Sequence, residues 1–406
     1  MPNVKSSLGS DAELNLNSFE SKFCSSVIPS LRQLKPYPAG KPIEETKREL
    51  GLKDVVKLSS NENPLGPSPE AMKRVQSEIL TMNLYPDAAL FSLRQALVGF
   101  FKAKVSATAI STLKTTNFIV GCGSNEIIDL LFRVFVPADA EIVTHEKSFA
   151  AYKLCAQLQG STFTEVAVDK DFEVNTDRIL NAVTEKTRVV ILANPNNPTG
   201  RSIPKSQIES LAAGLLEKNI LFVLDAAYEE FIDDSEPFAF ASELWSRFPN
   251  VVALYTFSKI YGLAGLRVGF GLAHDGVAKF LNQARQPFNI SALSAAAAEA
   301  ALHDRAFVAR SRENNAQVRA KVEREIKALS FSVTPSRANF VLVDMSPSGK
   351  SGQECFEALL KKGFIVRPVN NYNLQNYIRI SIGTQEEMDG FLAVFRQLFS
   401  KHVGFK

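Results

Sequence analysis

Six short apolar runs between residues 118 and 273 constrain the fold of this 406-residue chain more than any other feature. They are FIVG, AEIVTH, TRVVILANP, LFVLDAAY, VVALYTFS and LRVGFGLA, and they end at turn or polar residues. Runs without polar alternation are typical of strands buried on both faces of a sheet. Helical patterns at 125–135, 149–159 and 206–219 separate the first four runs, which predicts an α/β fold with a mostly parallel sheet. The last two runs are joined by a short loop, so one antiparallel neighbour is predicted there.

The C-terminal part of the chain has a different pattern. Residues 291–329 are rich in Ala, Glu, Arg and Lys and predict a long helical region with one break near 303–304. Strands are then predicted in FSVTPSRANFVLVD, GFIVRPV and YIRISIG, with helices around them, which makes a smaller α+β domain. The predicted division is an N-terminal extension, partly disordered, at 1–27, an arm belonging to the small domain at 28–60, a large domain at 61–290 and a small C-terminal domain with a long interdomain helix at 291–406.

Composition excludes several classes of protein. The net charge is +3 and the basic residues are spread along the chain, so no nucleic-acid partner is expected. The N-terminus lacks the apolar core of a signal peptide, and no apolar stretch is long enough to span a bilayer, so no membrane partner is expected. The four cysteines form no C-x-x-C pair, so we expect no metal and a reducing, cytoplasmic location.

Polar clusters follow several of the predicted strands, where α/β proteins bind ligands. GCGSNE, at residues 121–126, follows a strand and opens a helix, so the N–H groups of Ser124 and Asn125 could cradle an anion. A plain strand–helix turn would explain that motif equally well. YTFSKIYGLAGLRVGF supplies Thr256, Ser258 and Arg267, a donor set that suits a phosphate.

Three further residues point to chemistry at the same strand ends. Asp225 lies near the end of the apolar run LFVLD, where a carboxylate must be solvated, paired or bound to a ligand cation. NPNNPTG closes another strand in a rigid polar turn that contains Asn197. Lys259 belongs to the cluster that follows the strand VVALYTFS, although alone it could be a surface lysine.

Together these motifs resemble the class-I/II aminotransferases of pyridoxal-phosphate fold type I. The order is NPNNPTG, then D-x-x-Y, then T-x-S-K-x-x-x-L-A-G-L-R-x-G. LKPYPAGKP, VKLSSNENPLGPSP, LYPD, RANF and GFIVRPVNNYNLQNYIRISIGT are similar to the histidinol-phosphate aminotransferases within that family. The resemblance covers about residues 28–401. It implies a large domain whose mostly parallel mixed sheet is sandwiched by helices, plus a smaller α+β domain.

The resemblance implies pyridoxal 5'-phosphate (PLP) as the cofactor and assigns roles by position. Lys259 matches the lysine that carries the cofactor, and Asp225 matches the carboxylate that pairs with the pyridine nitrogen. Tyr228 and Asn197 match donors to the phenolate oxygen of the ring. Lys259, Asp225 and Tyr228 are therefore the predicted catalytic residues. The other predicted cofactor contacts are the stacked ring of Phe149 and the phosphate ligands Ser124, Asn125, Thr256, Ser258, Arg267 and Tyr85.

The resemblance also implies the substrates and the assembly. Arg379 matches an arginine that grips the substrate carboxylate, and Arg367 matches one that helps to hold the phosphate of histidinol phosphate. Tyr37 and Asn339 also match substrate-side positions. Tyr85 matches a tyrosine that reaches the phosphate of the neighbouring chain, which implies a homodimer with shared active sites. The implied reaction is ping-pong transamination between histidinol phosphate and 2-oxoglutarate, in histidine biosynthesis.

Departures from the family pattern leave alternatives for the substrate. Ala226 stands where a glutamate is common, DAALFS lacks glycines that often follow the YPD element, and His145 and Glu146 replace small or proline residues. An aminotransferase for phenylalanine or tyrosine, or a decarboxylase for an amino acid such as threonine phosphate, would share most of the cofactor residues. A non-catalytic regulator usually carries a DNA-binding domain, for which the N-terminal segment is too short.

Overall fold

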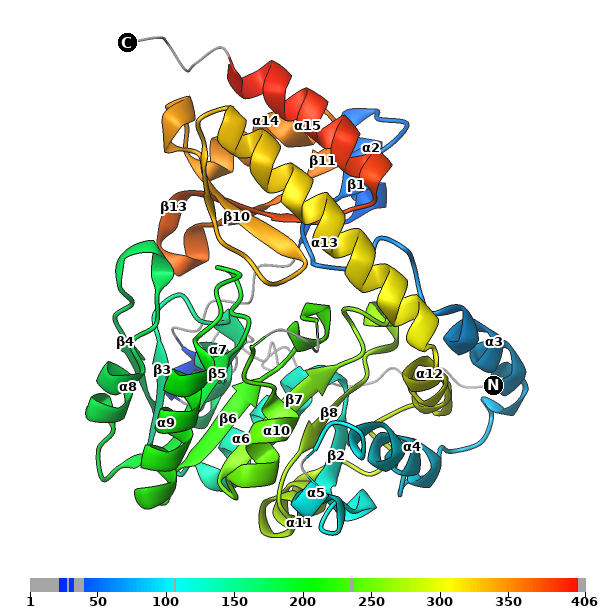
Figure 1. Cartoon of the computed structure of the whole chain (residues 1–406), viewed down its shortest axis with the longest axis vertical. Helices are drawn as coiled ribbons and strands as arrows, with labels where there is room; N and C mark the ends of the chain where they lie inside the picture. The colour runs from blue at the N-terminus through cyan, green and yellow to red at the C-terminus, as the bar shows by residue number, and fades with distance from the viewer. Residues whose placement is uncertain (1–21, 28, 33–39, 106, 234–236, 401–406) are drawn as a thin grey trace, which may run out of the picture.

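A seven-stranded sheet dominates the computed structural model, which describes residues 22–27, 29–32, 40–105, 107–233 and 237–400 (Figure 1). The strand order is β2-β8-β7-β6-β5-β3-β4. Only β8 runs antiparallel to its neighbours β7 and β2, which confirms the predicted mixed, mostly parallel sheet. The strands are β2 (Phe118–Gly121), β3 (Glu141–His145), β4 (Thr162–Val166), β5 (Thr187–Ala193), β6 (Leu221–Asp225), β7 (Val251–Thr256) and β8 (Gly269–Leu272).

The sheet is covered by helices on both faces, because alternate side chains of each buried strand point to opposite sides. Within β5, Val190 and Leu192 pack into one apolar cluster, and Val189 and Ile191 pack into another. One face is covered by α6 (Gly123–Phe135), α7 (Ala150–Gln159) and α11 (Asp275–Ala284). The other is covered by α4 (Phe91–Phe101), α8 (Thr176–Ala182), α9 (Lys205–Glu217) and α10 (Ala241–Arg247).

The edge strand β4 was not predicted from the sequence. Its residues TFTEV are half-buried or exposed, unlike those of β2, the fully buried strand at the other edge. A strand with a solvated face needs no continuous apolar run, so β4 lacks the pattern that predicted the other six strands of the sheet.

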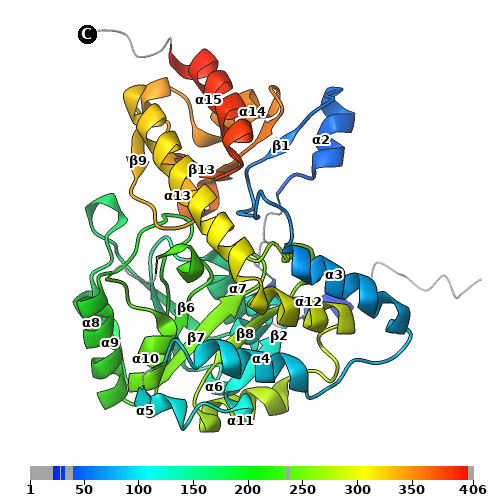
Figure 2. The same cartoon turned by 45° about the vertical axis from the view of Figure 1, so that its right-hand side comes forward.

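A second, four-stranded sheet lies above the first in the view of Figure 1. Its antiparallel order is β12-β13-β10-β9, and it packs with the helices around it into a separate apolar cluster. The elements are α13 (Arg305–Ala328), β9 (Ser332–Thr334), β10 (Phe340–Asp344), α14 (Gly352–Leu360), β12 (Arg367–Val369), β13 (Leu374–Ser381) and α15 (Gln385–Phe399). The N-terminal strand β1 (Val56–Lys57) pairs in parallel with β11 (Phe364–Ile365). Figure 2 shows β1 beside the smaller sheet.

The long helical region is divided where the sequence predicted a break. Helix α12 (Ala292–His303) ends there, and the side chain of Asp304 caps α13 by accepting a bond of 3.1 Å from the N–H of Phe307. The same carboxylate accepts a bond of 2.7 Å from Ser68. Ser68 in turn caps the helix α3 (Pro69–Glu78), so one aspartate joins three helix ends. The remaining short helices are α2 (Ile43–Leu50) and α5 (Ala107–Ile110).

The predicted limits of the two domains remain a prediction. Within the described ranges, no helix combines the length and the apolar character that crossing a bilayer would require.

Candidate active site

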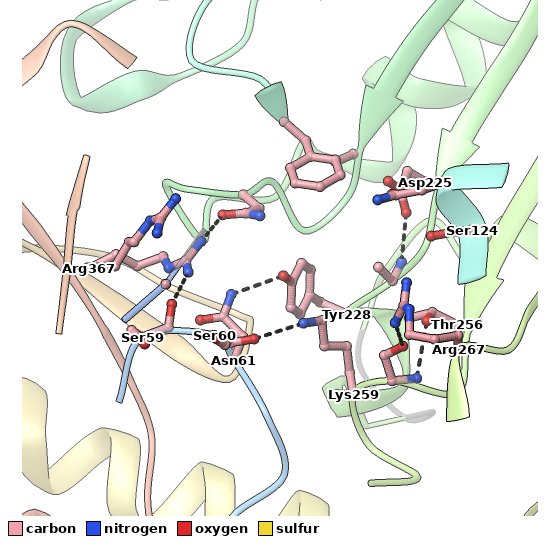
Figure 3. A pocket seen from close by; sticks show the side chains of 18 residues that line it. Ser59, Ser60, Asn61, Ser124, Asp225, Tyr228, Thr256, Lys259, Arg267 and Arg367 are labelled. Atoms are coloured by element: carbon pink, nitrogen blue, oxygen red, sulfur yellow. Dashed lines mark hydrogen bonds between the residues drawn. The ribbon is translucent and has the colours of Figure 1, made fainter. Parts of the chain in front are cut away.

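A cavity of about 270 Å³ opens at the carboxyl edge of the large sheet, beside the smaller sheet (Figure 3). Asp225 is the last residue of β6 and Thr256 the last residue of β7, and both line the cavity. Parallel strands end at the same edge of a sheet, which brings these distant residues together. The structure places twelve of the predicted residues in its wall, namely Ser124, Asn125, Phe149, Asn197, Asp225, Tyr228, Thr256, Ser258, Lys259, Arg267, Arg367 and Arg379.

One end of the cavity is formed by the first turn of α6. Ser124 and Asn125 lie at this helix N-terminus, where backbone N–H groups are unpaired and the helix dipole is positive. Thr256 and Arg267 approach the same end (Figure 3). The guanidinium of Arg267 is steadied by a bond of 3.3 Å to the hydroxyl of Ser258. This set of N–H, hydroxyl and guanidinium donors suits a phosphate dianion.

Gly123 makes that cradle possible. Its φ of +71° lies in the left-handed region, and a Cβ built on it would lie only 2.7 Å from Nη2 of Arg267. A methyl group here would therefore strain the backbone and push the guanidinium aside.

We expect Gly123→Ala to raise the dissociation constant of PLP at least about tenfold, because the phosphate donors lose their geometry. Equilibrium titration of the apo-protein by fluorescence measures this constant. Gly99→Ala is the matched control, since no atom lies within 4 Å of the added Cβ at that exposed helical position. Equal affinities of the two variants would contradict the expectation.

The carboxylate of Asp225 faces the cavity from its buried position at the end of β6. It accepts bonds of 2.7 Å from the hydroxyl of Tyr152 and 3.1 Å from the N–H of Ala227. Burial raises the pKa of Asp225, while these two donors and the charge of Lys259 oppose that rise. A cation on a ligand would stabilise the ionised form, so the environment suits a protonated ring nitrogen.

The ammonium group of Lys259 lies on the opposite wall from Asp225, next to Tyr228 (Figure 3). It donates a bond of 3.0 Å to the carbonyl of Ser60 and lies 5.8 Å from the centre of the Tyr228 ring. Burial, followed by the positive charge of Arg379, lowers the pKa of Lys259 to about 8. A substantial fraction of this amine is therefore neutral near physiological pH, which a nucleophile or a general base requires.

Tyr228 and Asn197 are oriented by neighbours that leave donors available. The Tyr228 oxygen accepts a bond of 3.0 Å from the side-chain amide of Asn61, so its own proton can be donated into the cavity. The Asn197 oxygen accepts a bond of 2.5 Å from Arg379, which turns its amide nitrogen away from the arginine. Burial raises the pKa of Tyr228 to about 12, so it stays a donor.

Two arginines of the smaller sheet line the remaining wall. Arg379 lies on β13 and Arg367 lies on β12, and the two are direct partners in the antiparallel ladder. Arg379 is only 6% exposed, and its guanidinium donates a bond of 2.6 Å to the carbonyl of Ser59. Among the described residues, the lining contains four basic side chains and one carboxylate, namely Lys259, Arg267, Arg367, Arg379 and Asp225. Such a cavity favours a ligand with several negative charges.

Two predicted site residues are not among the described residues that line this cavity. Asn339 is buried, and its amide donates a bond of 3.0 Å to the carbonyl of Asn61, which is a lining residue. Its role on the substrate side stays a prediction. Tyr85 is 83% exposed and packs its ring 4.8 Å from that of Phe288, outside the cavity of its own chain. Tyr37 falls outside the described residues.

The structure also reveals site residues that sequence reasoning missed. Ser59, Ser60 and Asn61 line the cavity, and the hydroxyl of Tyr152 donates to the carboxylate of Asp225. The SSN triplet lies in VKLSSNENPLGPSP, which the resemblance singled out only as a whole motif. Tyr152 gave no such signal, because an aromatic residue on the apolar face of a helix normally predicts core packing.

His145 is fully buried at the end of β3, with one ring nitrogen 2.6 Å from the carbonyl of Glu146. Burial lowers its pKa to about 4 from an ordinary value of 6.5. As the pH is lowered from 6.5 to 4, the unfolded chain therefore binds a proton on this residue that the folded chain does not bind. The protein becomes less stable as the pH falls through that window.

When the pH is lowered from 7.5 to 5, we expect the free energy of unfolding of the wild type to decrease by about 2 kcal/mol more than that of His145→Gln. Urea unfolding of both proteins at the two pH values measures it, and a constant difference would contradict it.

The chain belongs to the class I and II aminotransferases. The sequence model of that family, "Aminotransferase class I and II", matches residues 53–395. This chain is 40% identical over 372 residues to a histidinol-phosphate aminotransferase of Anaeromyxobacter sp. (strain Fw109-5), and the match covers 92% of this chain and 98% of the relative. It is also 40% identical to a histidinol-phosphate aminotransferase of Akkermansia muciniphila, covering 90% and 96%.

A solved structure agrees with this assignment. The histidinol-phosphate aminotransferase of Sinorhizobium meliloti, crystallised in complex with pyridoxal-5'-phosphate, is 27% identical to this chain. The two superpose with a TM-score of 0.80 over 93% of this chain and 98% of the other. The predicted fold type I architecture is therefore confirmed.

Proposed function

We propose that this protein is a PLP-dependent aminotransferase that moves the amino group of L-histidinol phosphate to 2-oxoglutarate. The observation that carries the proposal is the cavity in which Lys259 and Asp225 face a common space bordered by Arg267, Arg367 and Arg379. The relatives at 40% identity bear the name of this reaction's enzyme. A cavity with four cations also suits a bound phosphate together with an anionic substrate.

The wall residues fit PLP at each of its polar groups. The first turn of α6, with Thr256, Ser258 and Arg267, would hold the phosphate. Asp225 would pair with the ring nitrogen, and Tyr228 and Asn197 would donate to the phenolate oxygen. Phe149, which precedes α7 and lines the cavity, would cover one face of the ring. Gly123 and Gly269 keep the cradle open, since a Cβ on Gly269 would lie 2.6 Å from the Ser124 nitrogen.

When bound, PLP would supply an electron sink that makes the proton on the substrate Cα acidic. Lys259 would act as the general base that takes this proton onto Nζ, and then as the acid that delivers it away from Cα, to the cofactor side. Its pKa of about 8 suits both roles near neutral pH. Asp225 keeps the ring nitrogen positive, which strengthens the withdrawal of electrons.

The paired arginines would serve both substrates in turn. Arg379 has a fixed orientation, because Asn197 and the Ser59 carbonyl hold its guanidinium. We assign it to the carboxylate next to the reacting carbon of 2-oxoglutarate. Arg367 would hold the phosphate of histidinol phosphate and the distal carboxylate of 2-oxoglutarate, since a guanidinium binds either oxyanion. Ping-pong kinetics follow because both substrates use one site.

Exposed apolar side chains support a homodimer with shared active sites. Several large apolar side chains near Tyr85 in the sequence are more than about half exposed, namely Leu80, Met82, Leu84 and Phe91. Phe288, which is 44% exposed, packs its ring 4.8 Å from that of Tyr85. A soluble monomer seldom exposes such a patch, and a second copy of this chain would bury it. In that dimer Tyr85 would reach the phosphate of the partner's PLP. The four cysteines are free, which agrees with a cytoplasmic location.

A half-reaction panel tests the substrate. The PLP-loaded protein is mixed without acceptor with histidinol phosphate, phenylalanine, tyrosine or glutamate, and the change in its near-UV and visible absorbance is followed. We expect histidinol phosphate to react at least about tenfold faster than phenylalanine, and Arg367→Ala to remove that preference. Faster reaction with phenylalanine would favour the aromatic aminotransferase. Release of carbon dioxide from threonine phosphate would favour the decarboxylase, and no change with any amine would favour a regulator.

A further inference from the structure

Two buried pairs of a tyrosine and a glutamate lie next to the active site. Glu229 and Glu230 directly follow Tyr228, and both side chains are buried. The hydroxyl of Tyr255 donates to Glu229 over 3.2 Å, and the hydroxyl of Tyr261 donates to Glu230. Both tyrosines belong to the segment that carries Lys259. The pairs therefore join the segment of Asp225 and Tyr228 to the segment of the lysine.

The two tyrosines differ in how their backbone is held. Tyr255 lies inside β7, whose ladder bonds fix it between β6 and β8. Tyr261 lies in the turn that follows Lys259, outside any strand or helix. That turn is closed by a bond of 3.0 Å from the N–H of Gly262 to the carbonyl of Lys259. The backbone carbonyl of Tyr261 also accepts a bond of 3.2 Å from the N–H of Ser68. The turn has no ladder of strand bonds such as the one that holds Tyr255, so its side-chain bonds add to these few backbone bonds in fixing it.

Glu230 is itself attached to the helix α13. The Nε of Arg312, in the second turn of that helix, donates a bond of 3.0 Å to the carbonyl of Glu230. The side-chain amide of Asn63 reaches the same region, with bonds of 2.6 Å to the carbonyl of Ile260 and 2.9 Å to the hydroxyl of Ser311. The turn after Lys259 is thus bonded on one side to Glu230 and on the other to Asn63, and both are attached to α13.

We propose that Glu230 and Tyr261 are positioning residues that set the location of the Lys259 amine by holding the turn in which it lies. Glu230 acts through Tyr261 and touches neither cofactor nor substrate. A displaced turn moves Nζ of Lys259 away from the carbonyl of Ser60, which is now 3.0 Å from it. Misplacement of a reacting group by about 1 Å can cost about a hundredfold in rate.

The proposal rests on the aminotransferase function, and four variants test it with a built-in control. Tyr261→Phe and Glu230→Ala each remove the bond at the turn. Glu230→Gln keeps an oxygen that accepts from Tyr261, and Tyr255→Phe removes the matching buried bond from the strand. For each PLP-loaded variant we would measure kcat per bound PLP, KM, the pH titration of the PLP absorbance band, the dissociation constant of PLP and the melting temperature.

We expect Tyr261→Phe and Glu230→Ala to lower kcat about tenfold to a hundredfold with KM changed less than about threefold. Their absorbance titration should shift, because it reports the surroundings of the Lys259 nitrogen. Glu230→Gln should restore kcat and the titration. Tyr255→Phe should lower the melting temperature but leave kcat within about twofold of the wild type, since the ladder still holds its backbone.

Equal kcat values and equal titrations for Tyr261→Phe and Tyr255→Phe would overturn the proposal, and so would a wild-type titration in Glu230→Ala. A wild type that transfers no amino group would instead refute the proposed function. In that case the absorbance titration and the PLP dissociation constant would still decide whether the turn positions the lysine.

Discussion

Lys259→Ala is expected to lower kcat by about four orders of magnitude, because the variant loses the lysine that faces the cavity and with it the proposed general base. A positioned proton-transfer group contributes up to about 10⁴-fold. The measurement is a single-turnover reaction of the PLP-loaded variant with histidinol phosphate. PLP should still bind through the donors at the α6 end, although more weakly.

Lys259→Arg separates the charge of this residue from its proton transfer. A guanidinium stays protonated at all accessible pH values, so it supplies the charge but no base. We expect a loss as large as that of the alanine variant. Partial rescue of Lys259→Ala by added primary amines would support the role as a base, whereas turnover of either variant at the wild-type rate would refute it.

Asp225→Asn is expected to lower kcat by about three orders of magnitude, the second-largest effect. The amide has the shape of the carboxylate, and its oxygen can still accept the bond from Ala227. It carries no negative charge, however, so the ring nitrogen of bound PLP loses the group that keeps it protonated. Steady-state kinetics at saturating PLP measure the loss. A decrease of less than about tenfold would show that the carboxylate does not act on the ring.

Tyr152→Phe is the companion variant for that experiment. It removes the 2.7 Å bond to Asp225 but keeps the negative charge. Removing a donor raises the pKa of the aspartate further, yet the ring nitrogen still has its anion, so the loss should be far smaller than in Asp225→Asn. Equal losses in the two variants would mean that the geometry of Asp225, and not its charge, matters.

Several parts of the fold followed directly from sequence patterns. Continuous apolar runs predicted six of the seven strands, because a strand covered on both faces needs apolar side chains throughout. The short loop between VVALYTFS and LRVGFGLA predicted the antiparallel partner β8. Asp304 marked the break between α12 and α13, since its side chain caps the second helix.

The position of the polar motifs at strand ends predicted most of the cavity wall. Asp225, Thr256 and Lys259 follow buried strands, and parallel strands bring their ends to one edge. The substrate-side role of Asn339 stays a prediction, because a motif match gives the position along the chain but not the direction of a side chain. Tyr152 was overlooked for the same reason, since only the packing of α7 against the sheet turns its hydroxyl to Asp225.

The sequence by itself determined the mostly parallel sheet and the family, because each depends on local periodicity or on the order of motifs. The tertiary structure alone decided which groups share a bond across the chain. Asn61 meets Tyr228 from 167 positions away, and Ser59 meets Arg379 from 320 positions away. The physical reason is that the direction and burial of a side chain depend on packing between distant segments, and these two properties set its partners and its pKa.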